Sequence, residues 1–353
     1  MNRSLVSSLR CIKCGGALRL NGVGAGSEMA TVETGVMACA CGALFPVSGG
    51  IARLLPTAAD NSQLGAAGSN EDALREFVAQ WQRTQRSFGR QWNRYEVQSH
   101  AEDIATFEAK TGFARESLRG LRVLDAGCGG GRYSYVAGQA DAEVFSVDIS
   151  SAVEKAARLC QPFPNVQVLQ ANLLALPFPP AMFDRIFSIG VLHHTPDTHQ
   201  AFMALVPLLK PGGKISIWLY PKWDRLRETM NSFWRGITTR LPHDCVHAIS
   251  VATSPLGRLR GRVYAQGPRW LARVLWQSDK LLPGISNHPD PRQRVCDTFD
   301  WLTPQYQWHH TDDEVRSWFE QAGLIHVTNL SDTVVRYHAG QGHGVNFSGE
   351  RSH

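Results

Sequence analysis

The hydrophobic pattern between residues 121 and 219 alternates short apolar runs with amphipathic segments. The apolar runs predict β-strands at 122–125, 143–148, 166–170, 185–189 and 214–219. The segments between them predict helices, best marked at 132–139, 152–160 and 198–209. Strands that alternate with helices are typical of a parallel sheet covered on both faces. The pattern therefore predicts an α/β fold.

The flanking regions carry shorter patterns. An amphipathic helix is predicted upstream, where one face collects Leu74, Phe77, Val78 and Trp81. Downstream, the capping box at 311–314 predicts the start of a helix that ends at Gly323. The runs 325–330 and 333–337 then predict a closing antiparallel hairpin.

These patterns divide the chain into six parts. We expect an N-terminal module at 1–57, a linker and helical cap at 58–112, an α/β core at 113–220, a basic helical insertion that caps the substrate at 221–303, a helix and β-hairpin completing the core at 304–338, and a flexible tail at 339–353. The linker expectation rests on the polar, low-complexity stretch 57–70.

Composition narrows the class of protein. Of the 353 residues, 43% are hydrophobic and 19% charged, and no apolar run reaches the roughly 18 to 20 residues that span a bilayer. The first ten residues also lack the apolar region of a secretory signal. We therefore expect a cytoplasmic protein without a membrane span.

Positive charge is concentrated in one segment. Between Lys222 and Pro283 the chain has eleven Lys or Arg and only four Asp or Glu, a larger surplus than the +5 of the whole chain. Such a segment could face phosphates, an anionic substrate or an acidic membrane surface. A helical insertion with a solvated basic face is the alternative.

Four of the eight cysteines form two close pairs, Cys11 with Cys14 and Cys39 with Cys41. In a cytoplasmic protein, cysteines are more often metal ligands or buried thiols than disulfides. Four thiolates can close a tetrahedral zinc site and supply the folding energy that a segment of about 55 residues lacks. A metal-free apolar module is the alternative.

A glycine-rich turn follows the first predicted strand. Asp125 precedes Gly127, Gly129 and Gly131 at the point where the strand leads into a helix. Glycine lets the backbone turn sharply and lie against a ligand. A dinucleotide site would favour Gly or Ala at position 132, where this chain has Arg, so the turn fits a ligand other than a pyrophosphate better.

Polar residues also follow the next two strands. Asp148 ends the second strand, where a carboxylate can accept both hydroxyls of a ribose. Asn172 and Leu173 follow the third strand, where a side-chain amide and a backbone N–H could read an adenine edge. In open α/β folds these strand ends meet at the ligand-binding edge.

The fourth strand leads into Gly190, a further candidate ligand contact, and then into His193 and His194. A histidine at this edge could take a proton from a hydroxyl or amine nucleophile. Both histidines are therefore candidate catalytic residues. The alternative is that they only shape the pocket.

Taken together, these motifs resemble the ordered motif set of class I S-adenosylmethionine (SAM)-dependent methyltransferases of the type 11 group. The resemblance covers about residues 121–221 and rests on 123–131, 147–148, 176–178, 183–184, 191–194 and 209–213. It implies a Rossmann-like, seven-stranded sheet with SAM as cofactor. It places Gly127, Gly129 and Gly131 along the methionine moiety, Asp125 at the turn and the amino group, and Asp148 on the ribose. Asn172 replaces the more usual Asp beside adenine, and an amide can accept the same hydrogen.

The N-terminal segment resembles the zinc ribbon of Trm112-like proteins. The resemblance rests on the cysteine pairs and on the runs 45–47, 49–51 and 54–56. It implies structural zinc held by Cys11, Cys14, Cys39 and Cys41. The ribbon could also serve as a surface for a protein partner. The second pair is Cys-x-Cys instead of the usual Cys-x-x-Cys.

The sequence thus predicts a methyltransferase that acts on an O or N nucleophile beneath the insertion. The large insertion and the aromatic run 297–311 favour a small molecule, such as a sugar-containing or natural-product intermediate. The basic insertion leaves RNA or rRNA as an alternative substrate. A non-catalytic SAM-binding scaffold subunit is a third hypothesis.

Overall fold

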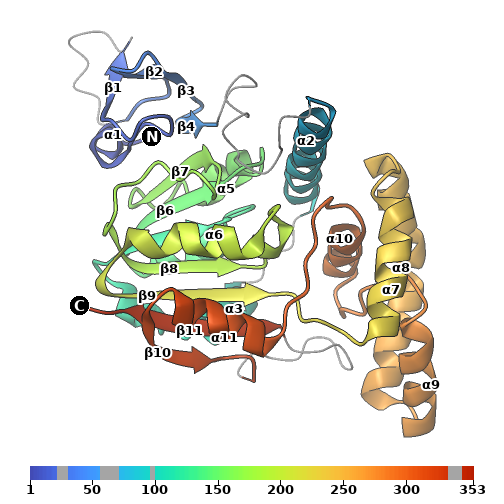
Figure 1. Cartoon of the computed structure of the whole chain (residues 1–353). Helices are drawn as coiled ribbons and strands as arrows, with labels where there is room; N and C mark the ends of the chain where they lie inside the picture. The colour runs from blue at the N-terminus through green and yellow to red at the C-terminus, as the bar shows by residue number, and fades with distance from the viewer. Residues whose placement is uncertain (22–30, 56–70, 96–99, 333–343) are drawn as a thin grey trace.

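The computed structural model describes residues 1–21, 31–55, 71–95, 100–332 and 344–353. The strands of this part of the chain form one sheet of eleven strands (Figure 1). The strands are β1 (Leu18–Asn21), β2 (Thr34–Cys39), β3 (Leu44–Ser48), β4 (Ile51–Leu54), β5 (Arg122–Ala126), β6 (Glu143–Asp148), β7 (Val166–Ala171), β8 (Phe183–Ile189), β9 (Leu209–Leu219), β10 (Leu324–Asn329) and β11 (Val345–Arg351). Together with the helices below, they confirm the predicted α/β fold.

Seven strands form the central part of the sheet, in the order β7-β6-β5-β8-β9-β11-β10. The first five run parallel, and β11 pairs antiparallel with both β9 and β10. The predicted total of seven strands was wrong, because β4 pairs in parallel with β7 and joins the N-terminal meander β1–β4 to the same sheet.

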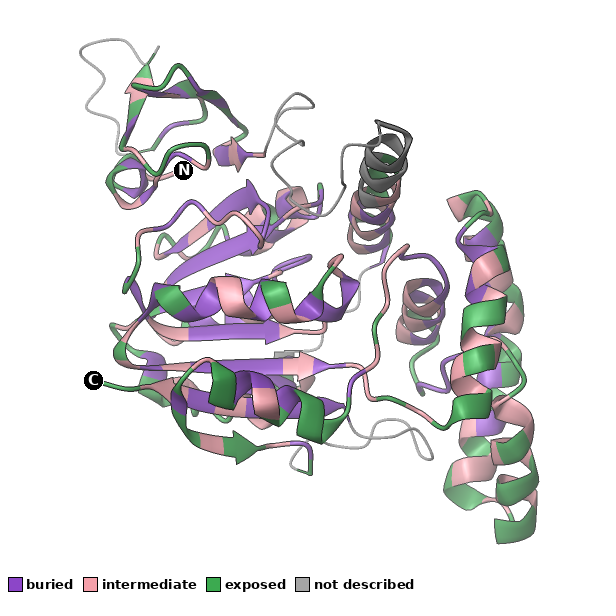
Figure 2. Cartoon of the chain, in the orientation of Figure 1, coloured by how far each residue is buried: buried purple, intermediate pink, exposed green. Residues whose placement is uncertain are grey.

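The central strands are buried on both faces, as their apolar runs predict (Figure 2). Successive residues face opposite layers: Val123 belongs to one apolar cluster, and Leu124 belongs to the other. In the first cluster Phe107 packs edge-on against Phe187, and in the second Phe202 packs against Phe319.

Helices cover both faces of the sheet. Helices α3 (His100–Thr111), α4 (Arg132–Gln139) and α5 (Val153–Leu159) pack on one face, and α6 (Thr198–Leu205) and α11 (Asp312–Gln321) lie on the other (Figure 1). Short helices are α1 (Leu5–Ser8) in the N-terminal module and the 3₁₀ turns η2 (Arg115–Leu118), η3 (Leu192–His194) and η4 (Val206–Leu208). The predicted capping box at Thr311 forms and starts α11.

A second group of helices lies at the end of the sheet toward which β8 and β9 point (Figure 1). It contains α2 (Glu71–Arg94), α7 (Arg225–Thr238), α8 (His243–Gln266), α9 (Arg269–Asp279) and α10 (Pro291–Leu302). A small apolar cluster with Tyr95, Val246 and Phe299 joins α2, α8 and α10. These helices therefore stand over the carboxyl edge of the parallel strands.

The C-terminal region differs from the prediction. Residues 345–351, expected in a flexible tail, form β11, and β10 pairs with that strand. The side chain of Asn346 is buried and donates to the carbonyl of Ala109. The predicted second strand at 333–337 and the predicted linker at 57–70 fall on residues outside those described. Among the described residues, no helix is long and apolar enough to cross a bilayer.

Candidate functional site

A cavity of about 390 Å³ lies between the carboxyl edge of the sheet and the helices α2, α7, α8 and α10. One face of α2 lines it with Thr84, Gln85, Phe88, Gln91 and Trp92, whose spacing places them along one side of the helix. Within the segment 88–92, the side chains of Phe88, Gln91 and Trp92 face the cavity.

The glycine turn after β5 lies on the floor of this cavity. The N–H groups of Gly127 and Cys128 both donate to the carbonyl of Val147, at 2.8 and 2.9 Å. Gly127 has a φ of +99°, and a Cβ there would lie 2.4 Å from the methyl groups of Val191. A Cβ on Gly129 would approach the indole of Trp92 to 2.9 Å. Both positions therefore require glycine, and both line the cavity.

Asp148 fixes the turn from the end of β6. One of its carboxylate oxygens accepts from the Gly129 N–H at 2.9 Å, and the other accepts from the Ser150 N–H and hydroxyl at 2.8 and 2.6 Å. Burial raises the pKa of this carboxyl. Asp148 lines the cavity, and its carboxylate has one lone pair left for a further donor.

Two predicted ligand contacts lie away from the cavity. Asp125 is buried under the turn, where it accepts from the Ser134 hydroxyl at 2.6 Å, and burial raises its pKa to about 7. Gly131 packs against α5, because a Cβ there would meet the Cα of Ala156 at 2.9 Å. Neither residue is among those that line the cavity. In this structure both support the turn from below.

The remaining predicted ligand contacts lie at the cavity. Asn172, Leu173 and Gly190 line it at the ends of β7 and β8. The side-chain oxygen of Asn172 accepts from the Leu174 N–H at 3.1 Å, whereas its amide nitrogen is buried with no partner in the structure. A buried donor without a partner is costly, so this nitrogen is available to an acceptor in the cavity.

The two candidate catalytic histidines have different surroundings. The ring of His193 stacks on the ring of Tyr220, with the two ring centroids 4.0 Å apart, and His193 does not line the cavity. His194 lines the cavity, and its Nδ1 lies 2.8 Å from the Tyr306 carbonyl. Since a carbonyl only accepts, Nδ1 carries the proton and Nε2 keeps a lone pair. This Nε2 is buried without a partner.

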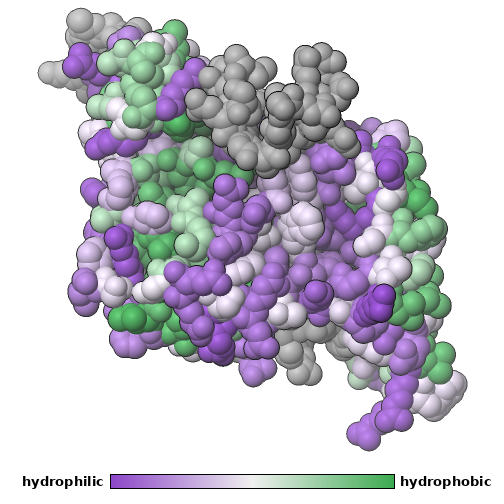
Figure 3. Space-filling model, in the orientation of Figure 1, coloured by the Kyte–Doolittle hydropathy of each residue, from purple (hydrophilic) through white to green (hydrophobic). Residues whose placement is uncertain are grey.

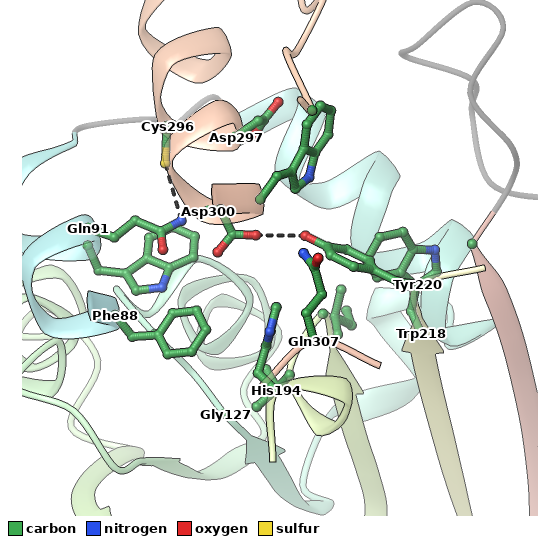
Figure 4. A pocket seen from close by; sticks show the side chains of 18 of the residues that line it. Phe88, Gln91, Gly127, His194, Trp218, Tyr220, Cys296, Asp297, Asp300 and Gln307 are labelled. Atoms are coloured by element: carbon green, nitrogen blue, oxygen red, sulfur yellow. Dashed lines mark hydrogen bonds between the residues drawn. The ribbon is translucent and has the colours of Figure 1, made fainter. Parts of the chain in front are cut away.

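A carboxylate and a tyrosine face His194 across the cavity (Figure 4). The Tyr220 hydroxyl donates to Asp300 at 2.6 Å, and burial raises the pKa of Asp300 to about 6. Lys110 also lines the cavity, with its Nζ 3.6 Å from the centre of the Trp218 ring, and burial lowers its pKa to about 7. The aromatic run 297–311 pointed to Asp300 only as part of a pocket wall, and no local pattern pointed to Tyr220 or Lys110.

The cavity extends under the insertion. Arg227 lines it and lies over the Trp223 ring, 3.9 Å from the ring centre. Arg260 forms a buried ion pair with Asp279, and its Nε and Nη1 have no hydrogen-bond partner in the structure. These groups provide buried donors on the wall opposite the sheet.

Burial of the histidines predicts a pH dependence of stability. Burial lowers the pKa of His194 to about 3, whereas a histidine in an unfolded chain titrates near 6.5. Between these values the unfolded state binds the proton and the folded state does not, so His194 destabilises the fold as pH falls. Asp125 acts oppositely, because its raised pKa makes the folded state bind the proton first.

Because of His194, the wild-type protein should lose about 1 kcal/mol of unfolding free energy for each pH unit below about 6.5. His194→Asn should not show this loss. Urea unfolding of wild type and variant at several pH values measures the difference. Asp125→Asn is the matched control and should change the pH slope in the opposite direction. Equal slopes for wild type and His194→Asn would contradict the prediction.

The four N-terminal cysteines come together as predicted. Their four Sγ atoms all lie within 4.8 Å of one another. The Sγ atoms of Cys11 and Cys41 are 3.7 Å apart, and those of Cys14 and Cys39 are 3.4 Å apart. Zinc–sulfur bonds of about 2.3 Å place the sulfurs of a tetrahedral site about 3.8 Å apart. The donor set and spacing therefore fit zinc, although the second pair is one residue shorter than usual.

Comparisons with known proteins identify one segment of the chain. Residues 124–217 match the family described as a methyltransferase domain, which confirms the methyltransferase resemblance for that segment. The N-terminal module lies outside the match, so its resemblance to Trm112-like proteins stays a prediction.

Curated relatives match a short part of this chain, whereas a solved structure aligns with most of it. A ubiquinone biosynthesis O-methyltransferase of Xylella fastidiosa is 40% identical over 106 residues, covering 29% of this chain and 43% of that protein. One from Xanthomonas campestris is 37% identical over 105 residues, covering 29% and 44%. The chain thus spans less than half of these relatives. The solved 1,6-didemethyltoxoflavin-N1-methyltransferase of Burkholderia thailandensis aligns at 17% identity and a TM-score of 0.44, covering 82% of this chain and 93% of that one.

Proposed function

We infer that this protein transfers a methyl group from SAM to an oxygen or nitrogen atom of a small molecule. The observation that carries this proposal is the arrangement of the matched segment. The glycine turn, Asp148 and Asn172 follow their strands at one cavity, which continues to His194 and under the insertion. In this proposal the cofactor and the acceptor share this one space.

The residues present fit SAM. Asp148 offers a lone pair for a ribose hydroxyl, and the unpartnered Asn172 nitrogen offers a donor to an adenine ring nitrogen. Gly127 and Gly129 bring backbone close to the ligand space. Bound there, SAM supplies a methyl group activated by its sulfonium. Asp125 and Gly131, proposed from the sequence as direct contacts, instead hold the turn in place.

The chain's own contribution is alignment and exclusion of water. Residues of α2 and α10 close the cavity over the sheet edge, and the Tyr220 hydroxyl and Asp300 can orient an acceptor by hydrogen bonds. His194 Nε2 can accept the proton of a hydroxyl nucleophile, whose oxygen would bond to the methyl carbon as that carbon's bond to the sulfonium breaks and leaves a neutral thioether. His193, stacked on Tyr220, holds that ring in position.

A small molecule is favoured over RNA because aromatic side chains line the proposed acceptor part of the cavity. Trp218, Tyr220, Trp301 and Tyr306 all line it. Isothermal titration with SAM, followed by transfer of labelled methyl groups to a small-molecule extract and to RNA, tests the proposal. Micromolar SAM binding with label in small molecules supports it. Absence of SAM binding by the folded chain would overturn it, and label confined to RNA would overturn the acceptor class.

We also infer that Cys11, Cys14, Cys39 and Cys41 hold a structural zinc ion. Two glycine turns support the geometry, since the Gly15 N–H donates to the Cys11 carbonyl and the Gly42 N–H donates to the Cys39 carbonyl. Thiolate ligation would stabilise a module whose strands are only four to six residues long. The site is structural in this proposal, because four protein ligands leave no open position.

We expect purified protein to contain about one zinc ion per chain, and Cys14→Ser to lower both the zinc content and the unfolding temperature. The melting of the N-terminal module should expose the edge of β7, which β4 covers. Metal analysis and thermal unfolding measure both effects. The matched control is Cys245→Ser, an exposed cysteine on α8 outside the cluster. Zinc-free wild-type protein with normal stability would contradict the proposal.

A further inference from the structure

The insertion helices expose an unusual amount of apolar surface. Of fourteen large hydrophobic residues exposed in the described part of the chain, ten lie between residues 226 and 282. They are Leu226, Phe233, Ile237, Val251, Leu256, Leu259, Trp270, Val274, Leu281 and Leu282. Figure 3 shows hydrophobic residues gathered along the edge of the molecule where α7 and α8 lie. Such a concentration marks a binding surface more often than scattered exposed residues do.

The exposed residues follow the helical repeat. On α7, Leu226, Phe233 and Ile237 are spaced seven and four residues apart, which places them on one side of the helix. Arg235 and Thr238 of the same helix are buried against the rest of the protein. Helix α9 has no buried residue, and its Trp270 is 66% exposed. Helices α7 and α9 are amphipathic, and the described part of the chain leaves these apolar residues exposed.

Basic side chains accompany the apolar ones. An exposed arginine directly precedes an exposed apolar residue at Arg225-Leu226, Arg258-Leu259, Arg269-Trp270 and Arg273-Val274. With Lys222, Arg240 and Arg262, seven basic residues of the segment are exposed. The two exposed acids, Asp224 and Asp244, are already in ion pairs with Lys280 and with Arg90 and Arg94. The apolar surface therefore has an uncompensated positive border.

A hollow of about 320 Å³ lies within this basic surface. Arg258 and Arg262 of α8 line it together with Arg294 of α10 and the exposed Leu259, and none of its described lining residues is acidic. Guanidinium groups bind phosphate oxygens in a bidentate manner. The exposed Arg258 and Arg262 would therefore offer donors to phosphate-sized anions next to an apolar side chain, whereas the buried Arg294 already donates to Ser254 and His288.

We propose that α7, α8 and α9 bind an anionic membrane surface as interfacial helices. Their apolar side chains enter the headgroup region, and the flanking arginines contact lipid phosphates, with their aliphatic stems along the apolar boundary. A protein partner or a second copy would also cover apolar residues, but the excess of positive charge around them complements anionic lipid. Helices that lie in the interface need no membrane-spanning segment.

The surface also leads to the cavity. Leu282 is 41% exposed, and it lines the cavity together with Pro283, Gly284 and Ile285. An amphiphilic acceptor could pass from the bilayer along this stretch to the reaction site. This consequence for the acceptor rests on the proposed methyltransferase function, whereas binding to the membrane surface does not.

Co-sedimentation of the full chain with vesicles tests the proposal. We expect binding to vesicles of phosphatidylcholine with about 30% phosphatidylglycerol, much weaker binding to phosphatidylcholine alone, and a loss of binding as salt rises. Trp270→Glu and Phe233→Glu should each weaken binding roughly tenfold, and Arg269→Glu with Arg273→Glu should do the same. The matched control is Leu44→Glu, because Leu44 is 63% exposed on β3 of the N-terminal module.

Thermal unfolding and SAM titration of each variant separate loss of fold from loss of binding. Failure of the wild type to bind anionic vesicles, or equal weakening by Leu44→Glu, would overturn the proposal. The proposal would also be overturned if the protein formed a dimer that Trp270→Glu dissociates and did not bind vesicles, since a second copy would then cover the surface. Binding to vesicles by protein that binds no SAM would support the membrane site and contradict the methyltransferase function.

Discussion

Asp148→Ala should weaken SAM binding by roughly 100-fold or more while the chain remains folded. Asp148 already accepts three hydrogen bonds, which leaves one lone pair for a ribose hydroxyl. A hydrogen bond of this kind to a carboxylate is worth about 1.5 to 3 kcal/mol, and 1.4 kcal/mol corresponds to a factor of ten. The same carboxylate holds the Gly129 N–H at 2.9 Å, so its removal also loosens the glycine turn. Isothermal titration of wild type and variant measures the change.

Asp184→Ala is the matched control for this variant. Asp184 also accepts from a backbone N–H, that of Arg122 at 2.9 Å, and it pairs with Lys210 at 2.8 Å, but it stands at the start of β8 instead of at the ligand edge. Its removal should lower the unfolding temperature and leave SAM affinity unchanged. Equal losses of affinity in both variants would indicate a general effect on the fold and contradict the role given to Asp148.

Most of the central sheet could be predicted because its signals are local. Each parallel strand is a short buried run followed by a turn, and the predicted bounds of β5 and β6 differ from the observed ones by at most one residue. The glycine turn and Asp148 were found for the same reason, since a strand end and its following loop are adjacent in sequence. The structure brings both to the cavity.

The parts that were missed depend on contacts between distant segments. The β4–β7 pairing joins residues 51–54 to residues 166–171, and no periodicity in either segment specifies a partner. Strand β11 was not predicted, because it contains the polar residue Asn346, which sequence alone would place at the surface. In the fold that residue is buried, and its amide reaches the backbone of α3.

The acceptor side of the cavity was also hidden from the sequence. Lys110, Tyr220 and Asp300 come from α3, the segment after β9 and α10, so only the tertiary fold brings them together. His193 and His194 could be named together but not distinguished. Their surroundings differ, because the Tyr306 carbonyl orients the His194 ring and the Tyr220 ring stacks on His193.

His194→Asn should lower kcat by roughly 100-fold to 1,000-fold and leave SAM affinity within about twofold of wild type. The asparagine amide can still donate to the Tyr306 carbonyl, but it lacks the basic lone pair that Nε2 offers to the acceptor. Burial lowers the pKa of His194 to about 3, so this lone pair is unprotonated throughout the neutral range, but it is a weaker base than a group that titrates near the operating pH. The assay uses the acceptor found by transfer of labelled methyl groups.

The pH profile separates proton transfer from simple positioning. If His194 takes the acceptor's proton, the residual activity of His194→Asn should rise with pH, because solvent must then remove that proton. His199→Ala is the matched control, since His199 packs against Trp318 away from the cavity and should not affect kcat. Should Asp300→Asn abolish turnover while His194→Asn retains it, the carboxylate held by Tyr220 would be the proton acceptor, and the role given to His194 would be wrong.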